Sequence, residues 1–391
     1  MLTRRVWVKF KINDFFVILK KMVELDITEE AYIKAKEALK RCETSYGLYA
    51  SGGKNGYKGV WSRDSMISLI GASTDKDKSY RDQFKKSLLT LGKYQSKLGQ
   101  IPNAVLHFER KNPEVDFKSI DSSLWFVLGH YMYKRRYKDA SLFKKDKEKI
   151  KKALTWIAYR DVGEDITLEQ LPTTDWQDAF PHKFGAVIST QTLYYKILDF
   201  VGDKKKMRKL NYIVNKNNQD KLWGGKFYWA YRWKNHNKYK EIGSWFDSFG
   251  NVLAILFDLA TKKQSKKILT YIKKNKINRP YQLKDIYPPI KKSSEYWQDY
   301  YYDAKATPNL YLNGGIWPYL GGFYVLALVK MKMFKEAKEE LEKLAEANLK
   351  GNTFPEWIDP ITKETHGEFQ AWSAGTYIWA YNSLKSKKFL I

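Results

Sequence analysis

The strongest constraint on the fold is an alternation between two kinds of helical segment. One kind is highly charged with a narrow apolar stripe, which is typical of a helix on a protein surface. The other kind is apolar or small on nearly all sides, which is typical of a buried helix. The charged segments cover residues 29–42, 80–97, 142–159, 203–216, 262–275 and 333–350. The apolar segments cover residues 64–73, 122–133, 185–200, 246–260, 318–331 and 371–384.

The spacing of the apolar helices predicts a closed ring. They begin near residues 64, 121, 180, 247, 317 and 371, so a two-helix unit recurs about every 55 to 70 residues. Six such units can close with the apolar helices inside. We therefore predict an all-α fold, an (α/α)6 toroid of six helical hairpins, formed by a single domain over residues 22–391. Residues 222–244 additionally predict a small β-hairpin at the rim of a pocket.

A polar and aromatic segment precedes each apolar helix, which an open solenoid does not require. These lead-in segments read "GVWSRD", "FKSID", "PTTDWQDAFPHKF", "EIGSWFD", "LYLNGGIW" and "THGEFQAWS". In a toroid of hairpins all six lie at one end and line a common pocket. The chain holds 14 Trp, 28 Tyr and 20 Phe. Aromatic faces beside hydrogen-bonding groups suit a sugar ring, which has apolar C–H faces and polar hydroxyls.

Composition argues against several other classes of protein. The only cysteine is Cys42, so no intrachain disulfide can form and a reducing compartment such as the cytoplasm fits. The five histidines show no metal-binding spacing, and no apolar run is long enough to span a membrane. The net charge of +27 is spread over many segments. This distribution favours a lysine-rich surface over a nucleic-acid partner.

Residues 1–21 are basic and partly apolar, with Lys9, Lys11 and Asp14 among them. These charges, with no small-residue cleavage site after them, argue against a signal peptide. We interpret the stretch as an N-terminal extension. Two explanations of residues 1–21 stay open. The start codon is assigned too early, or the residues form a genuine surface or strand extension.

Hydrolysis of a glycosidic bond needs two carboxyl groups, one to protonate the leaving oxygen and one to activate water or attack carbon. Asp121 lies beside Leu124 and Trp125, where desolvation would raise its pKa, although it could also act as a helix N-cap. Glu356 lies between Pro355 and a tryptophan in a loop, where a solvated carboxylate is the alternative. Asp178 is the reserve acid and Glu368 the reserve base.

Arg63 and Asp64 stand side by side at the start of the first apolar helix. They can form a structural ion pair, or a fork that binds sugar hydroxyls with Trp61 as a wall. The residue types alone leave both interpretations open.

Taken together, the motifs resemble those of a clan of glycoside hydrolases. "YKGVWSRDS" resembles the Trp–x–Arg–Asp segment of glucoamylases and of the amylo-α-1,6-glucosidase domain of debranching enzymes. "SIDSSLWFV" resembles a segment of debranching enzymes and alkaline/neutral invertases. "LNGGIWP" and "FPEWIDPITKETHGEFQAWS" are similar to invertase segments, with "LNGG" where invertases have "HNGG". The resemblance covers residues 45–385.

The resemblance implies roles for particular residues. Asp121 would be the general acid and Glu356 the general base, while Arg63 and Asp64 would hold the hydroxyls of the terminal sugar. The remaining residues expected to bind the sugar are Trp61, Trp125, Gln177, Asp178, Asn313, Trp317 and Trp372.

The function expected from the resemblance is an exo-acting, inverting glycoside hydrolase of the cytoplasm that releases a terminal hexose without a metal or cofactor. The expected hexose is glucose in an α-linkage. A neutral invertase-like enzyme and a hydrolase of an anionic glucoside such as glucosylglycerate stay open. So does a non-catalytic module that binds glycan or nucleic acid. We expect a carbohydrate substrate, no nucleic acid and no membrane, and the oligomeric state stays open.

Overall fold

The computed structural model describes residues 26–216, 220–235, 239–302 and 307–391. The predicted extension over residues 1–21, and the first residues of the domain predicted from residue 22, lie outside the described residues. Helices dominate the described chain, and three small antiparallel sheets accompany them.

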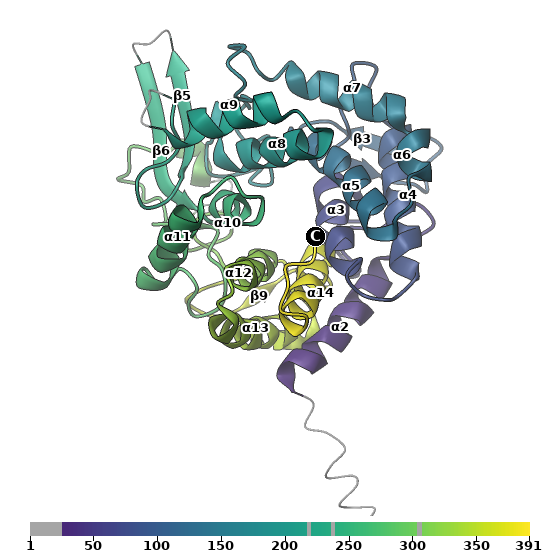
Figure 1. Cartoon of the computed structure of the whole chain (residues 1–391). Coiled ribbons are helices and arrows are strands. Elements are labelled where there is room, and N and C mark those ends of the chain that lie inside the picture. The colour runs from purple at the N-terminus through teal and green to yellow at the C-terminus, as the bar shows by residue number, and fades with distance from the viewer. Residues whose placement is uncertain (1–25, 217–219, 236–238, 303–306) are drawn as a thin grey trace, which may run out of the picture.

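Six buried helices form the inside of the molecule (Figure 1). Each packs against the next along the chain, and the last packs against the first, so the contacts form a closed cycle. The helices, in order around the ring, are α3 (Ser62–Ala72), α5 (Asp121–Tyr137), α8 (Ile188–Val201), α10 (Ser248–Leu256), α12 (Pro318–Lys330) and α14 (Ala371–Lys385). A helical toroid is therefore observed, as the alternation of segments predicted.

Amphipathic helices pack around the outside of this ring (Figure 1). They are α2 (Ile27–Cys42), α4 (Ser79–Lys93), α6 (Ser141–Lys145), α7 (Lys147–Ala158), α9 (Lys204–Asn215), α11 (Lys262–Lys274) and α13 (Phe334–Leu349). The single helix expected over residues 142–159 is divided at Asp146. This buried carboxylate lies 3.2 Å from Nε2 of His130 on α5, which ties the break to the inner ring.

Packing is tightest where the first inner helix meets the last. A Cβ atom on Gly71 of α3 would lie 2.2 Å from the carbonyl oxygen of Gly375 on α14. A Cβ atom on Gly375 would lie 2.4 Å from Cα of Ser68. The two backbones therefore touch at a distance that only glycine allows, and this contact closes the ring.

Three sheets lie in the connections between helices, so "all-α" describes the chain only approximately. The first contains β1 (Gly59–Trp61), β2 (Ala104–Leu106) and β3 (Glu114–Asp116). The second contains β4 (Ala186–Val187), β5 (Trp229–Asn235), β6 (Tyr239–Asp247) and β7 (Ile286–Tyr287). The third contains β8 (Trp357–Ile358) and β9 (Thr365–His366). Strands β5 and β6 form the predicted hairpin, as the centre of a larger sheet. Short 3-10 turns, η1 (Asp299–Tyr302) and η2 (Lys350–Asn352), complete the structure.

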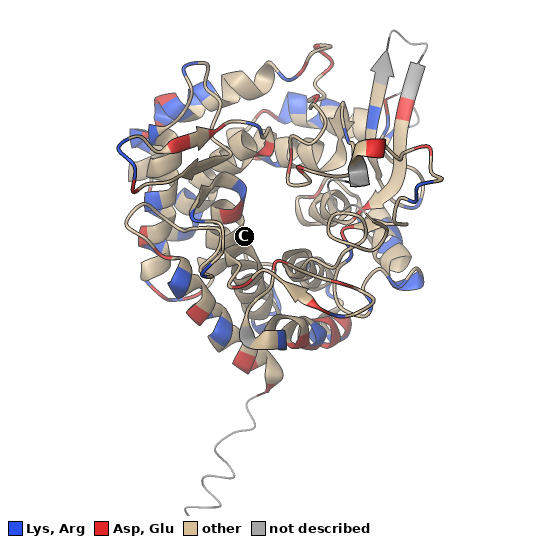
Figure 2. Cartoon of the chain, turned by 180° about the vertical axis from the view of Figure 1, so that it is seen from behind, with Lys and Arg blue, Asp and Glu red and all other residues tan. Residues whose placement is uncertain are grey.

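Lysine and arginine residues lie mainly on the outer helices and loops, as the coloured ribbon of Figure 2 shows from the opposite side. This arrangement fits the interpretation of the net charge as a lysine-rich surface. Within the described residues, no helix is long and apolar enough to cross a membrane.

Candidate active site

A narrow cavity of about 60 Å³, which we call the central cavity, lies at the N-terminal ends of α3, α12 and α14 and beside the loop before α8. Four of the six lead-in segments contribute to it, as expected if these segments share one end of the ring. The lining residues are Tyr57, Trp61, Arg63, Asp64, Trp176, Asp178, Tyr311, Trp317, Glu356 and Trp372.

Arg63 anchors the polar side of the central cavity. It lies in the first turn of α3, directly after β1, and is almost fully buried. Its Nη1 donates to both carboxylate oxygens of Asp121, at 3.0 and 3.1 Å. Its Nε lies 3.9 Å from a carboxylate oxygen of Asp64. That Nε has no hydrogen-bond partner among the described residues, so the group remains available to a ligand.

Asp121, the expected general acid, does not line the central cavity. Its side chain is buried behind Arg63, where it also accepts a hydrogen bond from the Ser119 hydroxyl. Burial raises the pKa of Asp121, and this shift is opposed by the charge of Arg63 and by the hydrogen bonds from Arg63 and Ser119. In the structure Asp121 is paired with Arg63, whereas the reserve acid Asp178 lines the cavity.

Three carboxyl groups do line the central cavity, and burial is the main cause of their altered acidity. Burial raises the pKa of Glu356 to about 7, and the negative charge of Asp64 adds to the shift. Burial raises the pKa of Asp64 to about 6, against the opposing charge of Arg63. Burial likewise raises the pKa of Asp178, again opposed by Arg63. Carboxyl groups with raised pKa values gathered in one cavity are characteristic of acid–base catalysis.

The Tyr57 hydroxyl lies 3.4 Å from Oε1 of Glu356, close enough to donate a long hydrogen bond. This contact lowers the pKa of Glu356 and so partly offsets the effect of burial. Tyr57 belongs to the loop over residues 51–58, which therefore reaches across the cavity to the loop that carries Glu356.

Four tryptophans form the aromatic wall. The ring centroid of Trp317 lies 5.3 Å from that of Trp176 and 5.8 Å from that of Trp372, each in an edge-to-face arrangement. The indole N–H groups of Trp61, Trp176 and Trp372 have no hydrogen-bond partner within the described part of the chain. Apolar faces with unused donors suit a polyhydroxylated ring.

Four of the expected site residues have other roles in the structure. Gln177 is fully buried and donates to Asp285 at 3.0 Å. Asn313 is fully buried and pairs with the backbone of Ile290. Trp125 belongs to the core. Glu368, the reserve base, accepts a hydrogen bond from the Lys54 backbone N–H at 2.9 Å and so holds the loop over residues 51–58.

Three lining residues were missed by the sequence analysis: Tyr57, Trp176 and Tyr311. Trp176 and Tyr311 lie within lead-in segments, so their position in the sequence could have identified them as residues of the pocket. Tyr57 lies in a glycine-rich loop, where nothing in the sequence distinguishes a lining residue from a solvent-exposed one.

A buried ionic cluster supports the segment that carries Asp178. The Lys183 ammonium lies 2.9 Å from Asp175 and 3.2 Å from Asp247. All three side chains are almost fully buried. Because Asp175 and Lys183 flank Asp178 in the chain, this cluster fixes the segment on both sides of Asp178. No group of three or more potential metal ligands occurs among the residues that the structure describes.

The fold and cavity define a helical ring with an acidic, aromatic pocket, and the comparisons with known proteins agree with this class. The model of the alkaline and neutral invertase family matches residues 238–387. The model of the amylo-alpha-1,6-glucosidase family matches residues 33–169. Both families belong to the six-hairpin glycosidase clan, so the resemblance found in the motifs is confirmed.

Among individual relatives, the mitochondrial neutral/alkaline invertase 1 of Oryza sativa is 35% identical over 140 residues. Cytosolic invertase 1 of the same species is 32% identical over 152 residues. These alignments cover 34% and 37% of this chain, and 22% and 26% of the respective relatives. The chain thus matches about a quarter of the length of these curated relatives.

Solved structures show the same fold over nearly the whole chain. The GH63 mannosylglycerate hydrolase of Thermus thermophilus, in complex with glucose, has a TM-score of 0.65 and 13% identity, and the match covers 89% of this chain and 99% of that one. A rhamnosidase of Klebsiella oxytoca has a TM-score of 0.66 and 15% identity, covering 92% and 64% of the two chains. At these identities the likeness concerns the fold alone.

Proposed function

We propose that this protein is an exo-acting, inverting glycoside hydrolase that releases a terminal hexose, with glucose in an α-linkage as the favoured substrate. The observation that carries the proposal is the presence of Asp178 and Glu356 in one narrow, tryptophan-walled cavity. The small volume favours one sugar ring over a longer segment of a chain, which agrees with exo action. The similarity to glycosidase families supports the same reaction class.

In the proposed mechanism, Asp178 is the general acid. Its side chain lines the central cavity and is only partly covered by the protein. Its raised pKa favours the protonated form that a donor needs. The proton passes from the Asp178 carboxyl to the glycosidic oxygen as the bond to the anomeric carbon breaks.

Glu356 acts as the general base. It removes a proton from a water molecule whose oxygen attacks the anomeric carbon from the opposite face, so the configuration inverts. Inversion requires the two carboxyl groups to lie about 6.5–9.5 Å apart, which leaves room for the water. Tyr57 holds Glu356 in place, and Arg63 and Asp64 bind hydroxyls of the terminal ring.

The proposal also covers the catalytic domain, the need for a cofactor and the location of the protein. The inner and outer helices together are those of an (α/α)6 catalytic domain over residues 22–391. Because two carboxyl groups suffice for this chemistry, no cofactor is needed. A single, buried cysteine fits a cytoplasmic location.

The invertase match favours sucrose as a second candidate substrate. The same two carboxyl groups would then cleave sucrose, with a fructosyl unit on one side of the bond. Release of fructose from sucrose, without release of glucose from maltose or panose, would identify this alternative.

The test is glucose release from maltose, maltotriose, panose, glycogen, sucrose and glucosylglycerate. Wild type is compared with Glu356→Gln and Asp178→Asn, and with Glu364→Gln as the matched control. Glu364 is an exposed carboxylate in the same segment as Glu356 but outside the cavity. Each active-site variant should lose at least about 10²-fold in turnover, whereas the control should keep its activity. Activity retained in Glu356→Gln or Asp178→Asn would remove that residue from its role.

A further inference from the structure

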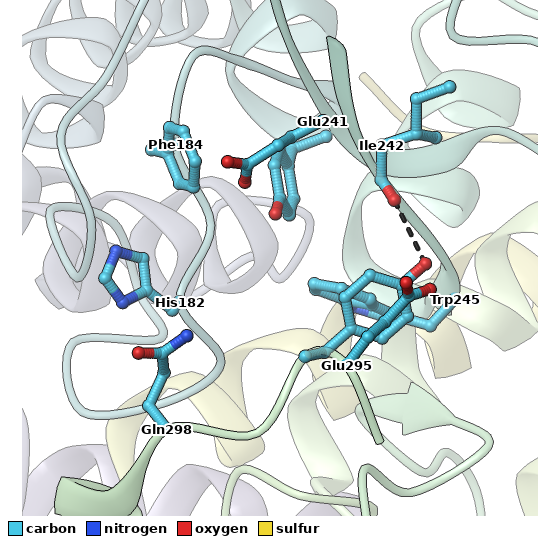
Figure 3. Close-up of a pocket in the computed structure, with 9 residues that line it drawn as sticks. His182, Phe184, Glu241, Ile242, Trp245, Glu295 and Gln298 are labelled. Atoms are coloured by element: carbon cyan, nitrogen blue, oxygen red, sulfur yellow. Dashed lines mark hydrogen bonds between the residues drawn. The ribbon is translucent and has the colours of Figure 1, made fainter. Parts of the chain in front are cut away.

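A second and larger cavity lies between the β5–β6 hairpin and the segments around residues 182–184 and 295–298 (Figure 3). We call it the rim cavity. It has a volume of about 440 Å³. Its lining residues are His182, Phe184, Tyr231, Glu241, Ile242, Trp245, Glu295, Tyr296 and Gln298.

Aromatic rings form a continuous wall of the rim cavity. The centroids of Phe184 and Tyr231 lie 5.0 Å apart, those of Tyr231 and Trp245 5.5 Å apart, and those of Trp245 and Tyr296 4.9 Å apart. The Tyr296 hydroxyl is fixed by the carbonyl oxygen of Ile242, at 3.1 Å. The wall is therefore preorganised, as a stacking surface for a sugar must be.

The polar groups of the rim cavity are acidic or neutral. Glu241 and Glu295 are exposed and line the cavity, and the Gln298 amide lies near His182 (Figure 3). Trp245 lines the cavity, and its buried indole N–H has no hydrogen-bond partner among the described residues. None of the nine lining residues is a lysine or arginine, although the chain carries a net charge of +27.

One short segment joins the rim cavity to the central cavity. Trp176 and Asp178 line the central cavity, and His182 and Phe184 line the rim cavity. Four residues of extended chain span at most about 14 Å, so the Cα atoms of Asp178 and His182 are no further apart than that. A leaving group protonated by Asp178 therefore starts within a few sugar lengths of the rim cavity.

We propose that the rim cavity is the subsite for the leaving group, and that Glu241 and Glu295 make it select uncharged or cationic sugars over anionic ones. This inference rests on the proposed function. Two carboxylates near a bound carboxylate or phosphate repel it, while they accept hydrogen bonds from hydroxyl or ammonium groups. The positive charge of the chain as a whole is thus a poor guide to its substrate.

The main test compares two α-glucosides whose two-unit leaving groups differ in one charge at the reducing end, maltotriitol and maltotrionate. Wild type should have a kcat/KM for the neutral compound at least about ten-fold above that for the anionic one. In the double variant Glu241→Gln/Glu295→Gln this ratio should fall at least about five-fold. The matched control is Glu339→Gln/Glu346→Gln, which removes two exposed carboxylates from outer helix α13. Hydrolysis with the same ratio in the double variant and wild type overturns the inference and leaves the proposed function standing.

A binding experiment separates the two proposals. Maltotriose is titrated into the Glu356→Gln protein while tryptophan fluorescence is followed, and the titration is repeated with Trp245→Phe added. The added substitution keeps a ring but removes the indole N–H. It should weaken binding at least about five-fold. Equal binding in both proteins overturns the inference. Trp245-dependent binding without hydrolysis of any glycoside overturns the proposed function but keeps the rim cavity as a sugar site.

Discussion

At the residue scale, charged residues with similar positions at the start of an apolar helix differ in whether they line the central cavity. Arg63 and Asp64 were expected to bind the sugar, and both line the central cavity. Asp121 resembles a catalytic acid by its sequence context alone, yet its carboxylate is committed to Arg63. Sequence shows which residues neighbour a helix start but not which direction a side chain takes. Asp178 and Asp121 therefore became distinguishable only in three dimensions.

The raised pKa of Glu356 predicts the pH dependence of the reaction. A general base must be ionised, so kcat/KM should rise as the pH increases through about 7. Tyr57→Phe removes a hydroxyl whose hydrogen bond lowers that pKa, so this limb should move to higher pH. Exposed Tyr159→Phe is the control and should leave the profile unchanged. A rate that falls through pH 7 would instead make Glu356 the proton donor.

The buried pair of Arg63 and Asp121 predicts a stability effect. Asp121→Asn leaves the guanidinium without its ionic partner in the interior, which should cost about 3 to 5 kcal/mol of unfolding free energy. Urea denaturation followed by circular dichroism measures this loss. An Asp178→Asn variant should lose activity without a comparable loss of stability. An Asp121→Asn protein as stable as wild type would contradict the structural role.

At the element scale, the helices were predictable because burial leaves a pattern over 12 to 17 residues at a time: α7 has an apolar stripe, and α5 is apolar or small on nearly all sides. The sheets were largely not predictable. Strands β4, β7, β8 and β9 have two residues each, too few to show any alternation. Only β5 and β6, with seven and nine residues, gave a recognisable hairpin.

The contact between α3 and α14 predicts where the ring is most sensitive. Gly375→Ala would force the two backbones apart, since the new Cβ would overlap Ser68 of α3. We expect a loss of about 1 to 3 kcal/mol or more, measured by thermal or urea unfolding. Gly163→Ala is the control, because a Cβ there meets nothing closer than 3.8 Å. Equal stability of the two variants would show that the helices can separate without cost.

At the scale of the whole molecule, charge and fold are largely independent. The lysines that give the net charge of +27 lie mainly around the perimeter, while the central cavity contains three carboxyl groups and one guanidinium. The overall composition therefore reflects the outer surface of the ring, whereas the lead-in segments supply most residues of the central cavity.

The excess positive charge predicts a dependence of stability on salt. Like charges around the perimeter repel one another, and the screening length falls to about 10 Å at 0.1 M ionic strength. The melting temperature should therefore rise when sodium chloride is increased from 10 to about 150 mM. Circular dichroism at 222 nm measures the transition. A melting temperature that falls over this range would show that attractive ion pairs dominate instead.

The packing of α2 and α14 against each other has one more consequence. The first and last described helices are neighbours, so the ring has no structural beginning. The packing of the helices therefore does not dictate which hairpin must come first in the chain. A chain that started at another hairpin, with its present ends joined by a linker, would still be able to build the same ring around the same cavity.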